Sequence, residues 1–421
     1  MPASASTDPT ETLLTRRLEA LAFGLLAIVP LAMALINRSA QPVLVAAALS
    51  ALGARIAAGE LTLVRERIVA TVTRPLGLVC AAFLVFGAIS IGWGHHFKTS
   101  IAAYGELLLA AASLLTLHGA LPRRIPSWTL KLAAIALALG CLSIVTELST
   151  GMALRGQLGA RNYVFIFKRS VTAMLILFWP IAIYLWIAGK RGVAVALLAL
   201  FAVAIYFAGS SAAAMALAAG LAVALLAVLS LHAASFLMAV ALACAMLVAP
   251  ILGEAAMRVL PTHVVDRLHF AHADQRIDVW LSFGEVVKRR PIGGVGFGTS
   301  SRMAQEPVAQ EVPEDRRVML GAWHAHNGYL QIWAETGVIG AALAGTALVL
   351  LALGIAGAPL PRGVATAAVM ASAGAIMLVG HGVWQGWWGA VLGIAAIWIS
   401  RLPERTDQAA AALPRNPVAK T

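Results

Sequence analysis

The amino-acid sequence predicts an all-α, polytopic integral membrane protein with about 12 transmembrane helices and one large loop that itself contains helices. Of its 421 residues, 60% are hydrophobic and only 12% are charged, whereas a soluble domain is about half apolar and a quarter charged. Apolar runs of roughly 17 to 22 residues recur along the chain, each long enough to cross a hydrocarbon core of about 30 Å. A single long polar segment, 254–336, interrupts them.

Each predicted span is an unbroken apolar stretch bounded by charge, proline or glycine. The stretches lie at about 18–36, 41–58, 72–92, 100–119, 128–147, 170–188, 192–207, 212–229, 233–253, 337–356, 363–381 and 385–400. The predicted organisation is therefore nine spans within 1–253, a polar loop at 254–336, three spans within 337–401, and a disordered tail at 402–421.

The distribution of charge predicts how the chain is oriented. The net charge is +12, yet residues 254–336 hold nine basic and ten acidic residues and are close to neutral. The rest of the chain holds 22 basic and nine acidic residues, so the excess positive charge lies there. An even number of spans puts both termini on one side, and the short connectors and tails on that side carry 16 Lys and Arg against six on the other. The positive-inside rule then predicts cytoplasmic termini, an outward-facing polar segment and no nucleic-acid partner.

Within the polar segment, the stretch DQRIDVWLSFGEVVKRR from Asp274 to Arg290 has the periodicity of an amphipathic helix. We expect its apolar side to lie along the membrane face. Pro291 ends the helix, and the glycines of PIGGVGFGTS that follow allow a tight turn or the close approach of a ligand. The glycine spacing matches neither a dinucleotide-binding turn nor a P-loop.

Polar side chains crowd the sequence just before the tenth predicted span, namely His324, His326, Asn327, Gln331 and Glu335. A histidine titrates near neutrality and can take a proton from a hydroxyl, which makes His326 a candidate general base. The alternative is an interfacial histidine that caps a helix. In a helix the two histidines would point about 200° apart, so only one of them would face a site.

A zinc site is a further alternative for these histidines. It would join His324 and His326 to His263, His269 or His272. The HExxH pattern and similar ligand spacings are missing from the sequence, which argues against a metal centre.

A basic cluster between the fifth and sixth predicted spans departs from the positive-inside pattern. It comprises Arg155, Arg161, Lys168 and Arg169. Guanidinium groups bind phosphate oxygens through paired, charge-assisted hydrogen bonds, so this cluster is a candidate site for a diphosphate headgroup. The alternative is simple contact with the phospholipids of the outer leaflet.

Taken in order, three motifs resemble the O-antigen ligase and O-antigen polymerase superfamily. They are R-x-x-x-W at Arg276–Trp280, P-x-x-G-x-G-x-G at 291–298, and His326-Asn327 followed by Gly337-x-x-Gly340. The length, the twelve spans and the large loop before the tenth span resemble the lipopolysaccharide O-antigen ligases of that superfamily.

The resemblance implies a glycosyltransferase of the bacterial inner membrane that uses neither a cofactor nor a metal. It would move O-antigen glycan from undecaprenyl diphosphate to a sugar hydroxyl of lipid A-core on the periplasmic face, among membrane lipids. By position, His326 resembles the catalytic histidine and Arg276 the essential loop arginine, with Asn327, Gln331 and His324 in support. Relatives often carry Ser-Arg near the start of a middle span, whereas this chain has Ser210-Ser211.

Two other functions remain compatible with the sequence. An O-antigen polymerase would join lipid-linked repeat units by the same chemistry. A transporter of lipid-linked glycan belongs to a different class and would need charges buried at the membrane midplane, where Glu106 is the main candidate.

Overall fold

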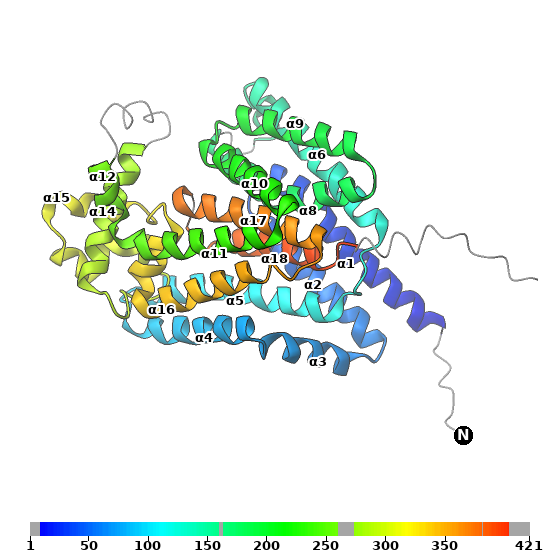
Figure 1. The fold of residues 1–421 in the computed structure, drawn as a ribbon, viewed down its shortest axis with the longest axis horizontal. Coiled ribbons are helices and arrows are strands. Elements are labelled where there is room, and N and C mark those ends of the chain that lie inside the picture. The colour runs from blue at the N-terminus through cyan, green and yellow to red at the C-terminus, as the bar shows by residue number, and fades with distance from the viewer. Residues whose placement is uncertain (1–8, 160–162, 260–272, 381, 404–421) are drawn as a thin grey trace, which may run out of the picture.

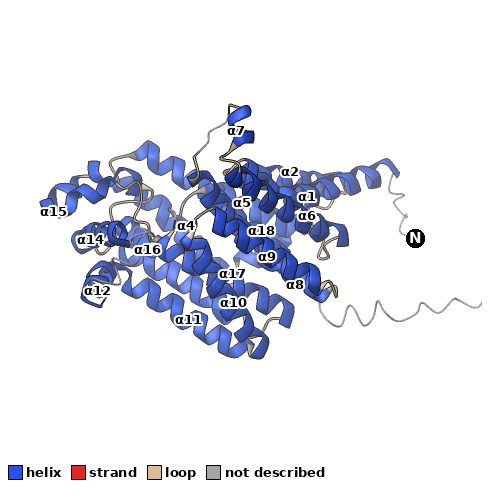
Figure 2. Cartoon of the chain, turned by 90° about the horizontal axis from the view of Figure 1, so that it is seen from above, coloured by secondary structure: helices blue, strands red, loops and turns tan. Residues whose placement is uncertain are grey.

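The computed structural model describes residues 9–159, 163–259, 273–380 and 382–403. All regular secondary structure in these ranges is helical, and they contain no strand (Figure 2). The described part of the chain is therefore all-α, as its composition predicts. The predicted tail at 402–421 lies almost wholly outside the described residues.

Ten helices are long and apolar enough to cross a membrane, some of them together with the helical turns that extend them. They are α1 (Pro9–Leu35), α2 (Ala40–Ala57), α4 (Pro75–Ser90), α5 (Phe97–Ala120), α6 (Ser127–Ser149), α8 (Phe165–Ile187), α10 (Ser211–Leu229), α11 (Leu231–Val248), α16 (Gly328–Leu353) and α17 (Leu360–Val379). This confirms a polytopic membrane protein.

Two shorter apolar helices, α9 (Arg191–Phe207) and α18 (Gly386–Ser400), complete the set that the sequence predicts. α18 has 15 residues, about 22 Å at 1.5 Å per residue, which falls short of a hydrocarbon core of about 30 Å. The predicted count of twelve therefore corresponds to ten full-length helices and two short ones within the described residues.

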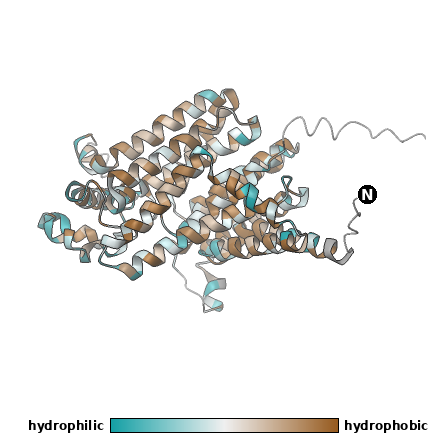
Figure 3. Ribbon diagram, turned by 90° about the horizontal axis from the view of Figure 1, so that it is seen from below, coloured by the Kyte–Doolittle hydropathy of each residue, from teal (hydrophilic) through white to brown (hydrophobic). Residues whose placement is uncertain are grey.

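The helices form one elongated bundle in which segments distant in sequence pack together (Figure 1). α1 packs on α2 and α6, α10 on α17, and α11 on α16. Many large apolar side chains on the bundle surface, such as Leu78, Phe236 and Leu247, are more than half exposed. In Figure 3 hydrophobic residues dominate these long helices, as expected for helices whose outer faces meet lipid.

The polar segment forms a layer of short helices at one end of the bundle (Figure 1). The layer begins just before this segment with η2 (Ala249–Ile251) and continues with α12 (Leu252–Val259), α14 (Ala273–Arg289), η4 (Thr299–Gln305), η5 (Pro307–Glu311), α15 (Glu314–Arg317) and η6 (Val318–Gly321). The predicted helix at 274–290 is confirmed as α14. Most of its apolar side chains are buried within the protein, and Phe283 and Val286 are fully so. This side of α14 therefore packs against protein, in contacts with α16 and the rest of the layer, rather than along the membrane face.

α16 begins nine residues before the predicted start of its span. The Asn327 side chain caps it by accepting a hydrogen bond from the Leu330 N–H at 2.9 Å. The helix is then interrupted at Gly337, where φ is 60° and ψ is −161°. The apolar pattern marks only the part after this kink, because Gln331 and Glu335 lie in the part before it.

A further helix, α3 (Leu61–Val72), lies in a connector for which the sequence predicts no span. Its sequence, LTLVRERIVATV, mixes charged and apolar residues, and it packs beside α5. The arginines of this connector are therefore held on a helix at the end of the bundle remote from the polar segment.

Candidate functional site

Two cavities meet at the boundary between the polar segment and the membrane helices, and Arg276 and His326 line both. The first has a volume of about 450 Å³ and is otherwise lined by Gln275, Val279, Met319 and Ala322. The second, of about 160 Å³, is otherwise lined by Lys168, Thr172, Ser210, Ser211, Ala212, Ile376, Val379 and Gly380. Two residues that the motifs single out are thus brought together from segments 50 positions apart.

His326 sits in a strained turn between η6 and α16. Its φ is 50°, in the left-handed region that a side chain rarely adopts, and Trp323 nearby has a φ of 23°. Strain of this kind persists only where the surroundings enforce it, and it gathers at functional sites.

The two histidines lie together because the backbone that joins them is not helical. The backbone N–H of His326 donates to Nδ1 of His324 at 3.2 Å, and the ring centroids are 4.1 Å apart. His324 Nδ1 acts as an acceptor and therefore carries no proton in this arrangement. The expected separation around a helix does not apply here, and His324 orients the turn that presents His326.

His326 is a neutral imidazole at physiological pH. Burial and, to a smaller extent, the positive charge of Arg276 together lower its pKa from 6.5 to about 4. The imidazole is therefore free to accept a proton.

Arg276 lies in the first turns of α14 and is partly buried. Burial lowers its pKa, but a guanidinium remains charged in proteins. Its side chain has no hydrogen bond or ion pair with the residues that the structure describes. A partly desolvated cation without a carboxylate partner is well suited to bind an anionic oxygen.

Lys168 adds a second cation to the smaller cavity from α8, and its ammonium lies 5.1 Å from the centre of the Phe165 ring. Ser210 and Ser211 line the same cavity, and Ser210 also caps α10 by accepting from the Ala213 N–H at 3.3 Å. Where relatives often carry Ser-Arg, this chain has Ser210-Ser211. The positive charge beside these serines comes instead from Lys168 on α8.

The other members of the predicted basic cluster do not line these two cavities. Arg155 donates to the carbonyls of Ala34 and Leu35 at 3.3 and 2.8 Å, so it caps the end of α1. Arg169 lies 5.7 Å from the centre of the Trp387 ring and lines a separate cavity of about 330 Å³.

Arg161 lies outside the described residues, as do His263, His269 and His272, which the zinc alternative requires.

Glu335 is the centre of a hydrogen-bond network to which the sequence assigned no role. Its side chain is fully buried and accepts from the N–H groups of Gly298 and Ser300 at 2.6 and 3.2 Å. It also accepts from the Trp384 indole at 2.5 Å and the Gln331 amide at 2.9 Å. Gln331 in turn accepts from the Val383 N–H at 3.1 Å. One carboxylate therefore joins the glycine turn, α16 and the loop before α18.

The glycine turn at 291–298 docks on the backbone of α16. The N–H groups of Val295 and Gly296 donate to the carbonyls of Ala334 and Glu335 at 2.9 and 2.8 Å, and the Val338 N–H donates to the Pro291 carbonyl at 2.8 Å. A Cβ on Gly294 would collide with the backbone of Glu335. The turn thus allows the close approach of two backbones, which fixes the polar segment on the membrane helices.

Comparison with known proteins gives one family match. Residues 195–345 match the model of a family described as O-antigen ligase. This range runs from α9 through the polar segment into α16, and it includes Ser210, Ser211, Arg276 and His326 but not Lys168. Among curated proteins, no match was found.

Proposed function

We propose, from the match of residues 195–345 to the O-antigen ligase family, that this chain is an O-antigen ligase. It transfers O-antigen glycan from undecaprenyl diphosphate to a sugar hydroxyl of lipid A-core. One observation carries the proposal: Arg276 and His326 line two adjoining cavities, and the smaller one adds Lys168 and two serines. The neutral base His326 thus lies between the larger cavity, which can hold the acceptor, and the smaller cationic cavity, which can hold the diphosphate of the donor.

The proposed reaction is a single displacement with inversion at the anomeric carbon. The oxygen of the acceptor hydroxyl forms a bond to that carbon, and the bond from the carbon to the donor phosphate oxygen breaks. Undecaprenyl diphosphate leaves with the electron pair. His326 takes the proton of the attacking hydroxyl as the new bond forms.

The cations have an electrostatic role in this scheme. Negative charge grows on the diphosphate as it departs, and Arg276 and Lys168 stabilise it without transferring a proton. Arg161 stays a candidate for the same role. Arg155 is better explained as the cap of α1, and Arg169, beside Arg38 in its own cavity, would meet a different part of a substrate.

Donor binding also prepares the base. While the donor is absent, the guanidinium of Arg276 lowers the pKa of His326. A bound diphosphate compensates that charge, so the pKa of the imidazole rises and His326 becomes a stronger proton acceptor. The order that follows is donor first and acceptor second.

The orientation proposed with this function places the enzyme in the bacterial inner membrane. The polar segment at 254–336 then faces the periplasm and both termini face the cytoplasm. The polyprenyl tail of the donor and the acyl chains of lipid A-core remain among the membrane lipids beside the helices.

The test is the lipopolysaccharide of a strain that lacks the gene. Loss of all long chains with accumulation of lipid-linked polymer supports a ligase. Core carrying one repeat unit would instead identify a polymerase. Re-expression of the wild-type chain should restore the long-chain lipopolysaccharide. The His326→Ala chain, present in the membrane at the same amount, should not restore it.

A further inference from the structure

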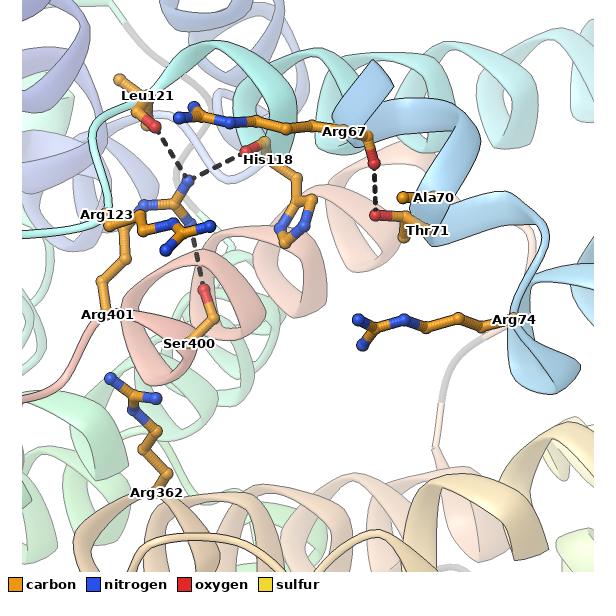
Figure 4. A pocket seen from close by; sticks show the side chains of 10 residues that line it. All are labelled: Arg67, Ala70, Thr71, Arg74, His118, Leu121, Arg123, Arg362, Ser400 and Arg401. Atoms are coloured by element: carbon orange, nitrogen blue, oxygen red, sulfur yellow. Dashed lines mark hydrogen bonds between the residues drawn. The ribbon is translucent and has the colours of Figure 1, made fainter. Parts of the chain in front are cut away.

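A second charged cavity lies at the other end of the membrane helices. It has a volume of about 590 Å³ and is lined by Arg67, Ala70, Thr71, Arg74, His118, Leu121, Arg123, Arg362, Ser400 and Arg401. Five of the ten are arginines, and the lining contains no aspartate or glutamate. We call it the basic pocket (Figure 4).

The basic pocket is separate from the candidate active site. At its first residues α5 adjoins the polar segment, where the His95 N–H donates to Glu306 at 3.2 Å. At its other end, about 36 Å away along its 24 residues, His118 lines the basic pocket. α17 likewise contributes Arg362 here and Val379 to the cavity of His326.

Part of the arginine set is structural. Arg401 donates to the carbonyls of Pro122 and His118 at 2.9 and 3.2 Å, and so ties the end of α18 to the end of α5. Burial and the charge of Arg67 lower the pKa of Arg401 to about 10. Arg67 itself donates to the Gly119 carbonyl at 2.9 Å. These bonds hold the positive charges in place, and within the described part of the chain no carboxylate forms an ion pair with either arginine.

Two arginines are left with unused donors. The guanidinium groups of Arg74 and Arg123 have no hydrogen bond or ion pair with the residues that the structure describes. Figure 4 shows Arg74 extending toward the open part of the pocket, whereas Arg362, which donates to the Leu402 carbonyl at 3.1 Å, lies on the side of Ser400 and Arg401. Five arginines that line one cavity repel one another, and an anion bound among them reduces the repulsion.

The surroundings of the pocket indicate where that anion comes from. Large apolar side chains next to the lining residues are exposed: Val69 by 51%, Leu78 by 55% and Leu360 by 37%. They adjoin Ala70, Arg74 and Arg362 along α3, α4 and α17. Arginines beside exposed apolar side chains, at the ends of membrane helices, are characteristic of the headgroup level of a bilayer.

We propose that the basic pocket binds the phosphate of an anionic phospholipid headgroup, with Arg74 and Arg123 as the contacting residues. The lipid enters between α3 and α17, and its acyl chains lie against the exposed apolar side chains. A soluble anion such as inorganic phosphate offers the same chemistry and is distinguished in the test. The proposal requires neither a glycan donor nor an acceptor, so it stands or falls independently of the ligase reaction.

The test uses the full-length protein in a nonionic detergent, with bound lipid measured by native mass spectrometry. Phosphatidylglycerol should bind, phosphatidylcholine should not, and millimolar inorganic phosphate should leave the bound lipid in place. The double variant Arg74→Gln/Arg123→Gln should weaken phosphatidylglycerol binding about tenfold or more. The matched control is Arg65→Gln, which removes one charge from the exposed side of α3 outside the pocket and should change affinity little.

The contrary outcomes are equally clear. Equal weakening by the double variant and by Arg65→Gln would mean general charge attraction and would overturn the site. Displacement of the lipid by inorganic phosphate would assign the pocket to a soluble anion. If the double variant does not fold, Ala70→Glu takes its place, because it keeps every arginine and adds a competing carboxylate. Undiminished lipid binding by Ala70→Glu would refute the proposal.

Discussion

His324 accepts the backbone N–H of His326 through Nδ1 at 3.2 Å, and this bond holds the left-handed turn in which His326 faces both cavities. The two histidines therefore have different tasks although their rings lie side by side. One positions the turn, and the other is the candidate base.

Replacement of His326 by alanine removes the proposed proton acceptor. We expect the rate of glycan transfer to fall about 100-fold or more, the usual contribution of a general base. Transfer from lipid-linked donor to lipid A-core by the reconstituted enzyme measures it, at matched protein levels in the membrane. Full ligation by this variant would exclude the mechanism.

His324→Ala serves as the comparison. It removes the hydrogen bond from the His326 N–H, worth about 1 kcal/mol, and leaves the base in place. We expect a loss of only a few-fold in the same assay. A loss as large as that of His326→Ala would assign His324 a direct part in the reaction.

Arg276 should shape the pH profile as well as donor binding. Burial of His326 and, second to it, the charge of Arg276 hold the pKa of His326 at about 4, so the free base persists down to mildly acidic pH. Arg276→Gln removes the charge, raises that pKa, and leaves less free base between about pH 4 and 6. The acid limb of kcat/KM against pH should therefore move to higher pH in the variant. An unchanged acid limb together with a higher KM would mean that Arg276 contributes to donor binding and not to the pKa of His326.

Gly294 and Gly293 offer a matched pair for the docking of the glycine turn. A Cβ on Gly294, at φ +67°, meets the backbone of Glu335, whereas one on Gly293 meets only the Trp93 side chain at 3.3 Å. Gly294→Ala should cost about 1–3 kcal/mol or more in stability, measured as a lower melting temperature in detergent. Gly293→Ala should be close to wild type. Equal melting temperatures would show that the turn does not need this close approach.

Glu335→Gln tests the buried hydrogen-bond centre. The new amide places N–H donors where the structure already supplies donors from Gly298, Ser300 and Trp384. An unsatisfied buried group costs about 1–3 kcal/mol, so the melting temperature should fall. Glu311→Gln, which breaks only an exposed pair with Arg290, should have little effect on it.

The sequence predicted features that depend on local pattern. Apolar length located the membrane helices, and apolar periodicity located α14. Motif order singled out Arg276 and His326, which the structure places on shared cavities.

Features that depend on tertiary contacts could not be predicted from the sequence. The four cations between the fifth and sixth predicted spans look equivalent in the sequence, yet Arg155 turns back to cap α1 while Lys168 reaches the cavity of His326. In the sequence Glu335 is one polar residue among several. Its central place was not predictable because its four hydrogen-bond donors come from three separate segments. The basic pocket was equally hidden, since its arginines belong to connectors far apart in the chain.

The kink at Gly337 has a practical consequence for exchanging parts between relatives. Because the glycine turn and the kinked part of α16 are interlocked through their backbones, they form one transplantable unit. A chimaera whose transplanted segment ends at residue 326 would take the glycine turn from one protein and the kinked part of α16 from the other. A junction placed after Ile339 would carry both halves together and keep His326 aligned with the membrane helices.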